Sequence, residues 1–400
     1  MARFWRTSPL GWLVGWIAAL VLALLAATLG PVAVASAAKP KRPVLFVANS
    51  EGGTVDVIDV RRLKKVGSIN VIPDGDMPHE PEKIAFYPTI VAAEGENFAQ
   101  DLAVSPNGRR LYVSRGFIGD VAAFRIKTGE LLWRVPIGGF RADHVALSED
   151  GRRLFVSALT ENEVEVVDTQ QRAVVGSFPT GDWAHNLHFS PDRERIYNGS
   201  LGNGLLPDDA DGERHVMTIA DARTLDVLET IPFEEGVRPF VITPNEKRFY
   251  VQLSYLHGFV VYDLESDRIV RTVNLSISKE ARQLDREDYP NEVAHHGIEL
   301  SHDRRFLCIA GTVSDYAALV RRPGLRLAAR IPVGDEPGEV AQSPNGRHCF
   351  VSNRGADANT ISVISYAKRK EVKRISVGDH PQHMHEDRIP ATVVKALRKR

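Results

Sequence analysis

Short apolar runs rich in β-branched residues alternate with tight-turn residues along this chain, and one such unit occurs in six clear copies. Each copy starts at a Ser or Thr, continues through a turn of Pro, Asn, Asp or Gly, and ends in a β-prone run. The copies are SPNGRRLYVSR from Ser105, SEDGRRLFVSA from Ser148, SPDRERIYNGS from Ser190, TPNEKRFYVQL from Thr243, SHDRRFLCIAG from Ser301 and SPNGRHCFVSN from Ser343. Successive anchors are 43, 42, 53, 58 and 42 residues apart. A period of about 40 to 45 residues with short strands predicts a β-propeller.

Each repeat is predicted to form four antiparallel strands. In the last repeat these are residues 339–342, 349–353, 360–365 and 372–377, counted from the channel outward. Third strands are recognisable near Thr54, Asp120, Glu163, His215, Phe259, Tyr316 and Thr360. Seven third strands predict an all-β, seven-bladed propeller over residues 38–390.

The first repeat lacks an innermost strand, because the chain opens on a second strand at Pro43 to Asn49. The segment His383 to Glu386 aligns with the innermost strand of the preceding repeat and is predicted to fill this gap. Such a closure removes free sheet edges from the ring. Residues 391–400, which end in KALRKR, are expected to be a frayed basic tail.

The N-terminal residues 1–37 resemble a targeting segment. Arg3 and Arg6 precede an apolar run from Gly11 to Gly30, and 35–37 (Ala-Ser-Ala) would suit a signal peptidase. The run is also long enough to span a bilayer. A cleaved signal peptide and an N-terminal membrane anchor therefore both remain open. Either one predicts an extracytoplasmic protein, secreted, periplasmic or in the cell envelope, that touches a membrane only through this segment.

The net charge and the positions of the two cysteines allow two further predictions. A net charge of −1 argues against a nucleic-acid partner. Cys308 and Cys349 lie in neighbouring repeats, one position out of step relative to their anchors. Since a strand alternates faces at each residue, the two side chains are expected on opposite faces, as buried thiols without a bond.

Three long segments decorate one end of the predicted ring: 73–98, 201–213 and 276–294. The other end has short turns throughout. Function tends to lie on elaborated loops held by a rigid scaffold, so the site is expected on the long-loop face, around the central channel.

Polar residues at the start of the innermost strands are the candidate site. Imidazole nitrogens and carboxylates gathered at one point suit Zn²⁺, Cu²⁺ or Fe²⁺. The candidate metal ligands are His144, His185, His188, His296, His383 and His385. The candidate ligand-binding residues are Asp101, Arg115, Asp143, Asn186, Arg238, Glu299 and Glu339. The alternative is a polar channel that holds water and no metal.

The segments VLFVANSEGGTVDVID (44–59) and CFVSNRGADANTISVI (349–364) resemble the YVTN family of β-propellers. That resemblance covers about residues 43–388 and implies the fold but no single reaction, because such propellers include binding proteins, lactonase-like enzymes and haem-bearing domains.

The first hypothesis for the function is a monomeric binding module for a small molecule or a protein partner. The second is a His-dependent, lactonase-like hydrolase, with or without a metal. The third is a propeller that handles haem or copper. The sequence contains no GxSxG, Walker, HExxH or CxxCH motif.

Overall fold

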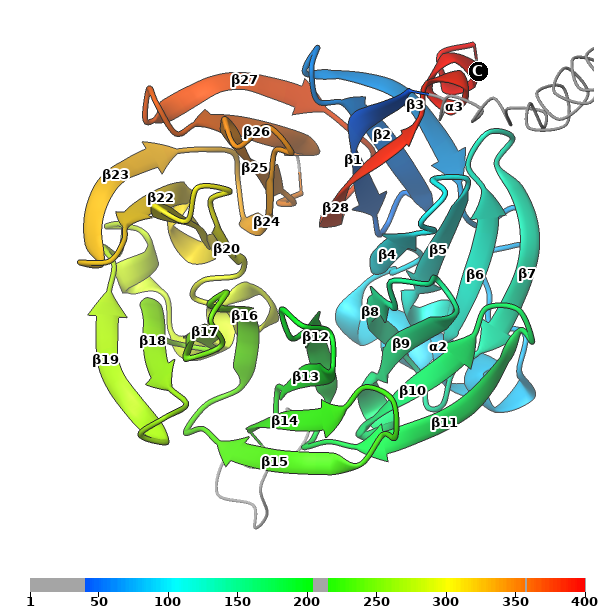
Figure 1. The fold of residues 1–400 in the computed structure, drawn as a ribbon, viewed down its shortest axis with the longest axis horizontal. Helices are drawn as coiled ribbons and strands as arrows, with labels where there is room; N and C mark the ends of the chain where they lie inside the picture. The colour runs from blue at the N-terminus through cyan, green and yellow to red at the C-terminus, as the bar shows by residue number, and fades with distance from the viewer. Residues whose placement is uncertain (1–39, 204–214, 357, 400) are drawn as a thin grey trace, which may run out of the picture. The chain divides into compact units, whose positions relative to one another are not determined.

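The computed structural model describes residues 40–203, 215–356 and 358–399. Seven four-stranded antiparallel sheets stand around a central axis (Figure 1) and confirm the predicted seven-bladed propeller. Residues Lys41–Arg400 form one compact unit. The predicted signal peptide or anchor lies outside the described residues. No helix within the described ranges is long and apolar enough to cross a membrane.

Each blade is named by its four strands, in order from the axis outward. Blade 1 contains β28 (Pro381–Pro390), β1 (Lys41–Asn49), β2 (Thr54–Asp59) and β3 (Lys64–Asn70). Blade 2 contains β4 (Asp101–Val104), β5 (Arg110–Arg115), β6 (Asp120–Arg125) and β7 (Glu130–Pro136). Blade 3 contains β8 (Ala142–Leu147), β9 (Arg153–Ala158), β10 (Glu163–Asp168) and β11 (Ala173–Pro179). Blade 4 contains β12 (Ala184–Phe189), β13 (Arg195–Ser200), β14 (Val216–Asp221) and β15 (Val227–Pro232).

The remaining three blades follow the same order. Blade 5 contains β16 (Val237–Ile242), β17 (Arg248–Leu253), β18 (Gly258–Asp263) and β19 (Arg268–Asn274). Blade 6 contains β20 (Ile298–Leu300), β21 (Phe306–Gly311), β22 (Tyr316–Arg321) and β23 (Arg326–Pro332). Blade 7 contains β24 (Pro337–Gln342), β25 (His348–Asn353), β26 (Thr360–Ser365) and β27 (Lys370–Ser376).

The anchor hydroxyl of each repeat explains why a Ser or Thr recurs there. Ser105 Oγ accepts a hydrogen bond from the backbone N–H of Arg110 at 2.9 Å, and Ser343 Oγ accepts one from His348 at 2.9 Å. The other four anchors bond the residue five positions later in the same way. The side chain thus satisfies a backbone donor at the tight turn that joins the two inner strands.

The C-terminal strand closes the ring. β28 pairs with β1 from Lys41 opposite Pro390 to Asn49 opposite Pro381, as predicted. The expected frayed tail, however, is wrong for residues 391–397. These residues form helix α3 (Ala391–Leu397), and its Val393, Val394 and Leu397 are buried in the hydrophobic cluster that blades 1 and 2 share. The apolar i, i+1, i+4 spacing gives the helix one buried side, so it docks instead of fraying.

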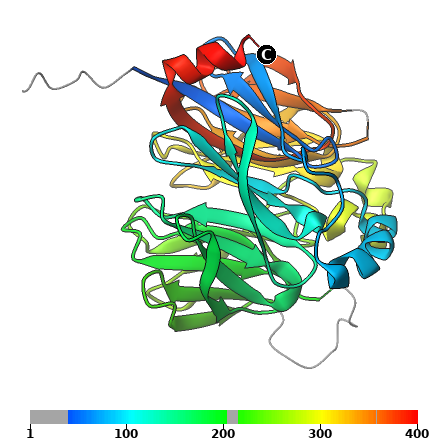
Figure 2. The same ribbon diagram turned by 90° about the vertical axis from the view of Figure 1, so that its right-hand side faces the viewer.

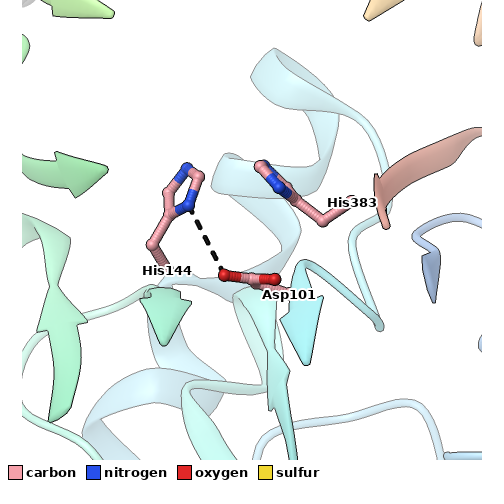
Figure 3. A group of neighbouring side chains, drawn as sticks. All are labelled: Asp101, His144 and His383. Atoms are coloured by element: carbon pink, nitrogen blue, oxygen red, sulfur yellow. Dashed lines mark ion pairs between the residues drawn. The ribbon is translucent and has the colours of Figure 1, made fainter. Parts of the chain in front are cut away.

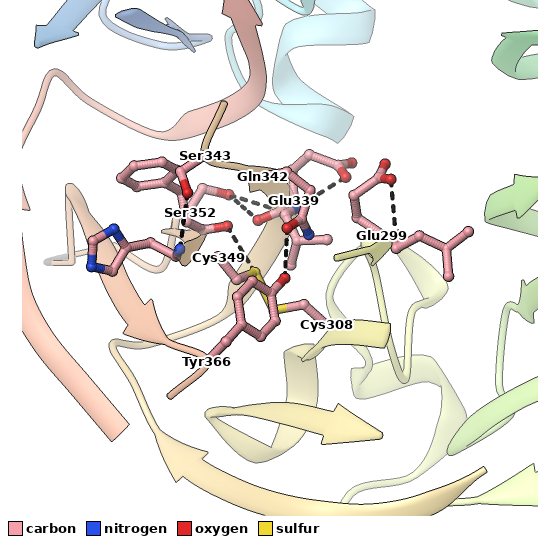
Figure 4. Close-up of a disulfide and its surroundings, with 12 residues drawn as sticks. Glu299, Cys308, Glu339, Gln342, Ser343, Cys349, Ser352 and Tyr366 are labelled. Carbon is pink, nitrogen blue, oxygen red and sulfur yellow. Dashed lines mark hydrogen bonds between the residues drawn. A yellow bond between two sulfur atoms is a disulfide. The ribbon is translucent and has the colours of Figure 1, made fainter. Parts of the chain in front are cut away.

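The two cysteines correct another prediction. Cys308 on β21 and Cys349 on β25 form a disulfide between blades 6 and 7 (Figure 4), with Cα atoms 6.6 Å apart. Both belong to one buried cluster between these blades. As strand alternation predicts, the two side chains lie on opposite faces of their blades. Adjacent blades pack face to face, however, so opposite faces of neighbouring blades meet, and the two sulfur atoms meet with them.

Two of the long segments carry helices. Residues 73–98 contain α2 (Pro81–Glu94), and 276–294 contain the 3₁₀ turns η3 (Ala281–Gln283), η4 (Arg286–Asp288) and η5 (Pro290–Glu292). Figure 2 shows both groups at the same end of the propeller, as predicted. The third segment, 201–213, falls almost entirely outside the described residues. Further 3₁₀ turns, η1 (Gly116–Ile118), η2 (Leu159–Glu161) and η6 (Thr312–Ser314), follow second strands.

Helix α2 is fixed to blade 2 by a buried lysine. Lys83 Nζ donates hydrogen bonds to the carbonyl oxygens of Gly119, at 2.6 Å, and of Ile137. A side chain at Gly119 would clash with Lys83, because an added Cβ would lie 2.6 Å from Nζ. Helix α2 is therefore held to the segments that follow β5 and β7.

Candidate functional site

Bulges in the innermost strands position the candidate site. In blade 3, Asp143 and His144 both lie opposite the single residue Ser157, between the pairs Ala142–Ala158 and Val145–Val156. Equivalent two-residue bulges occur at His185–Asn186, Arg238–Pro239, Gly338–Glu339 and Gln382–His383. A bulge breaks strict alternation and re-aims side chains. In a regular strand, consecutive residues point to opposite faces. The bulge allows two consecutive polar residues to lie together at the end of the channel.

Four imidazoles form a closed ring at this level. His144, His185, His296 and His383 come from blades 3, 4, 6 and 1. We call this circle of four histidine side chains the imidazole ring. Successive ring centroids are 4.4 Å (144–185), 5.8 Å (185–296), 6.2 Å (296–383) and 4.2 Å (383–144) apart. Each residue is no more than 5% exposed. Four residues far apart in the sequence thus share one buried site.

The nitrogen atoms of two of these residues are spaced like metal ligands. His144 Nε2 lies 3.3 Å from His185 Nε2, and Asp143 Oδ1 lies 3.6 Å from His144 Nε2. Two nitrogens bound at about 2.0–2.1 Å to a tetrahedral ion stand about 3.3–3.4 Å apart. Asp143, His144 and His185 each place a ligand atom within 4.8 Å of the others. The three residues therefore match the donor types and spacing of a transition-metal site.

A second group shares His144. Asp101 Oδ2 lies 3.5 Å from His144 Nδ1, and His383 approaches the same pair from β28 (Figure 3). Beyond it, Glu339 Oε2 lies 3.5 Å from His383 Nδ1 and 3.8 Å from His296 Nδ1. Carboxylates thus lie beside three of the four histidines, where they can orient imidazoles that hold a metal.

Burial keeps most of the imidazole ring neutral. It lowers the pKa of His383 to about 3 and those of His185 and His296 well below the ordinary value. Burial opposes charge on His144 as well, but its hydrogen bond to Asp101 and the nearby charge of Asp143 outweigh this and raise its pKa. Neutral imidazole keeps a free lone pair, the form that ligates metals.

Several nitrogen atoms of the four histidines make no hydrogen bond within the described ranges. His185 Nδ1, His296 Nδ1 and His383 Nε2 are buried without a hydrogen bond among the described residues. Buried polar atoms in folded proteins are nearly always satisfied, and leaving one unpaired costs free energy. The ring is therefore chemically incomplete as a purely structural network.

The channel itself is a cavity of about 810 Å³ on one side of the imidazole ring. It is bounded at its inner end by Asp101, His144, Asn186, Glu339 and His383, and it extends to the turn residues Pro106, Ser148, Arg193 and His302. These turns belong to the short-turn end. This cavity therefore extends from the imidazole ring toward the short-turn end, and not onto the long-loop face where the site was expected.

The predicted site residues divide into three groups. Asp101, Asp143, Asn186 and Glu339 surround the imidazole ring, as their alignment suggested. His188, Glu299 and His385 line the cavity instead, and none of the three belongs to a candidate metal group found among the described residues. Arg115 does not line the channel: it is fully buried in ion pairs with Asp74 and Asp120. Arg238 lies on the long-loop side of the ring and donates to Ser254 Oγ at 2.9 Å.

Sequence reasoning missed Arg141 and Arg354, which lie next to the imidazole ring. Arg141 Nε is 2.9 Å from Asp143 Oδ2, and Arg354 Nη1 donates to Gln382 Oε1 at 3.1 Å. A signal for Arg354 is present in the repeat, because blades 2 and 7 both carry an arginine where the second strand ends. Its burial depended on neighbouring blades and could not be read from that position.

Glu299 in the cavity gives a pH-dependent prediction. Burial, together with the charges of Glu339 and Glu386, raises its pKa to about 8. A carboxyl with a raised folded-state pKa destabilises the fold as pH climbs from about 4.5 to 8, because the unfolded chain loses that proton first. Glu299→Gln should therefore be more stable than the wild type at pH 9, by roughly 1–4 kcal/mol, and similar at pH 4. Urea unfolding at both pH values measures this.

Glu149→Gln at the exposed mouth of the cavity is the matched control for that experiment. It should leave the pH dependence of unfolding unchanged. An equal gain at pH 9 in both variants, or none in Glu299→Gln, would contradict a raised pKa at Glu299.

These blades and their polar channel define the class, a seven-bladed β-propeller. The chain is similar in structure to hydrazine synthase from Kuenenia stuttgartiensis, with a TM-score of 0.62, 19% identity, and coverage of 81% of this chain and 92% of that chain. It is also similar to a proposed 6-phosphogluconolactonase from Bacteroides fragilis (TM-score 0.64, 14% identity, coverage 88% and 99%). A third similar structure is a proposed 6-phosphogluconolactonase from Bacteroides uniformis (TM-score 0.61, 18% identity, coverage of 87% of this chain and 100% of that chain).

At these identities the similarities show the fold alone. The sequence matches no protein-family model and no curated protein. The resemblance to the YVTN family accordingly rests on the repeat motifs themselves.

Proposed function

We propose that the protein is an extracytoplasmic binding propeller whose imidazole ring holds one transition-metal ion and whose channel takes a small ligand. The observation that carries the metal site is the 3.3 Å separation of His144 Nε2 and His185 Nε2 within a buried ring of four imidazoles. Imidazole donors suit Zn²⁺, Cu²⁺ and Fe²⁺. Asp143, beside the same nitrogen, supplies negative charge to offset that of a cation.

The extracytoplasmic location has two supports. The inter-blade disulfide between Cys308 and Cys349 suits an oxidising compartment. The apolar N-terminal run after Arg3 and Arg6 suits export. Fusing a redox-dependent reporter enzyme to the C-terminus would test the location, since a reporter active only in the cytoplasm should stay inactive.

Metal analysis tests the binding site. Protein purified from its own host should contain close to one transition-metal ion per chain by elemental analysis. Metal-free protein should gain thermal stability when Zn²⁺, Cu²⁺ or Fe²⁺ is added, because binding to the native state alone stabilises it. His144→Ala should weaken metal binding by at least about tenfold, since losing even an indirect partner of a ligand costs that much.

His302→Ala is the control for this substitution, because His302 lines the short-turn end of the same cavity, away from the imidazole ring. It should retain full metal content. Metal-free native protein whose melting temperature does not respond to any of the three ions would refute the metal site.

A lactonase-like hydrolase is the second candidate. Burial raises the pKa of Glu339 to about 7, near the value that suits a general acid or base at neutral pH. This carboxyl borders both the imidazole ring and the cavity. Hydrolysis of a lactone that is lost in Glu339→Gln, with metal content retained, would establish the enzyme. Equal turnover by the variant would exclude Glu339 from that role.

A further inference from the structure

Buried arginines gather on the long-loop side of the imidazole ring. Arg238 is a bulge residue of β16, Arg354 follows β25, and Arg141 precedes β8. Arg238 and Arg354 are 4% and 2% exposed. Burial and the nearby positive charges of Arg354 and Arg141 outweigh the opposing charge of Glu292, and lower the pKa of Arg238 to about 10. Arg141 is partly exposed and paired with Asp143, so Arg238 and Arg354 are the two buried cations of this region.

Arg354 is the least satisfied of them. Its Nη1 donates to Gln382 Oε1 at 3.1 Å, but neither its Nε nor its Nη2 has a hydrogen-bond partner in the described part of the chain. Glu339 Oε2, an acidic oxygen on the neighbouring strand, lies near His383 and His296 and makes no hydrogen bond to Arg354. A buried guanidinium with two N–H donors that lack acceptors destabilises the fold, because the hydrogen bonds to water that it loses are not replaced.

Arg115 shows what the same edge of a guanidinium does elsewhere in this chain. Its Nε and Nη2 donate to the two carboxylate oxygens of Asp120, at 2.7 and 2.6 Å. Arg115 ends the second strand of blade 2, and Arg354 directly follows the second strand of blade 7. The equivalent edge of Arg354 is thus a two-donor fork without its acceptor. Such a fork matches the paired oxygens of a carboxylate or a phosphate.

A glycine allows this placement. A Cβ added to Gly338 would lie 3.0 Å from Arg354 Cδ and 3.2 Å from its Nε. The missing side chain lets the guanidinium lie across β24 and reach Gln382 on β28. Gly338 is also half of a bulge whose other residue, Glu339, stands beside the imidazole ring. The fork is therefore held next to the proposed metal site.

We propose that Arg354 is the centre of an anion site that binds the carboxylate or phosphate group of a small ligand. Arg238 and Arg141 add positive charge around the same group. The anion site defines the chemical class of the ligand, a carboxylate or a phosphate. It rests on the proposed function only for the role of ligand binding, since the fork does not involve the metal.

The test uses full-length protein stripped of metal by a chelator, so that failure of the metal site cannot be mistaken for failure of this one. Acetate and inorganic phosphate, titrated separately in a zwitterionic buffer of low salt, should give saturable heats and a rise in melting temperature. A response to acetate alone identifies a carboxylate ligand, and a response to phosphate alone identifies a phosphate ligand. Absence of saturable binding of both anions overturns the proposal.

Two substitutions separate this role from a structural one. Arg354→Met should abolish the anion-dependent rise in melting temperature and be at least as stable as the wild type without anions, because it removes a buried charge whose hydrogen bonds are incomplete. Arg354→Lys keeps the charge but loses the fork, and should bind at least about tenfold more weakly. A Met variant that is less stable in the absence of anions, or a Lys variant that binds as well as the wild type, contradicts the proposal.

Arg193→Gln is the matched control, because it removes one positive charge from the cavity lining at the short-turn end, whereas Arg354 does not line this cavity. It should bind both anions as the wild type does. Equal weakening in Arg193→Gln and Arg354→Lys would show that net charge, and not the fork, attracts the anion, and would overturn the proposal.

Discussion

A chain that ends at Asp379 is expected to lose cooperative folding. Without β28, strand β1 keeps an unpaired edge along its whole length, from Lys41 to Asn49. Ile389 and the helix that follows it would no longer cover the core of blades 1 and 2. The ring would be open, so every blade would lose the closure that holds the circle together. Circular dichroism and urea unfolding should show a loss of the single transition.

A chain that ends at Pro390 is the control for this truncation. It keeps β28 but lacks Val393, Val394 and Leu397, which are buried against blade 1. Burial of an aliphatic side chain contributes about 1.5–3 kcal/mol, so this chain should fold cooperatively with a stability lower by roughly 4 kcal/mol. A chain ending at Asp379 that unfolds at the wild-type urea concentration would contradict the importance of the closure.

Loss of the Cys308–Cys349 disulfide should destabilise the protein by about 4 kcal/mol. The bond joins residues 41 positions apart and so restricts a long loop in the unfolded chain. It also ties blade 6 to blade 7 inside a buried cluster. The double variant Cys308→Ala, Cys349→Ala, compared with the wild type by urea unfolding without reductant, measures the difference.

The reductant serves as the internal control. Dithiothreitol should lower the stability of the wild type toward that of the double variant and leave the variant itself unchanged. Two free thiols in the denatured, unreduced wild type would refute the disulfide.

The fold and its closure were predictable from the sequence because local chemistry determines them. The anchor residues, such as Ser105 and Ser343, bond the backbone five positions later within their own turns. Strand alternation then separates core from surface positions, and the number of repeats sets the number of blades. The unpaired second strand at 43–49 could be matched to the segment at 383–386 by the same repeat. All of these signals lie within one repeat or compare one repeat with another.

The composition of the site was only partly predictable. Alignment on the anchors placed His144, His185, His296 and His383 at the same end of the innermost strands, and the structure brings them into contact. It also grouped them with His188 and His385, which line the cavity instead. Position along a strand follows from spacing, whereas contact across a channel depends on which blades face each other and how far each side chain reaches.

What the sequence by itself determined is the ring of blades, its closure by the C-terminal strand and the end of the channel where the polar residues gather. The tertiary structure alone decided how those residues meet. The bulges at positions such as 143–144 turn both members of a polar pair toward the site. Face-to-face packing of blades joined Cys308 to Cys349. The neighbouring elements gave Arg115 the carboxylate of Asp120 but gave Nε and Nη2 of Arg354 no acceptor among the described residues. The physical reason is common to all three: alternation describes a strand alone, whereas bulges, sheet packing and charge pairing depend on the element beside it.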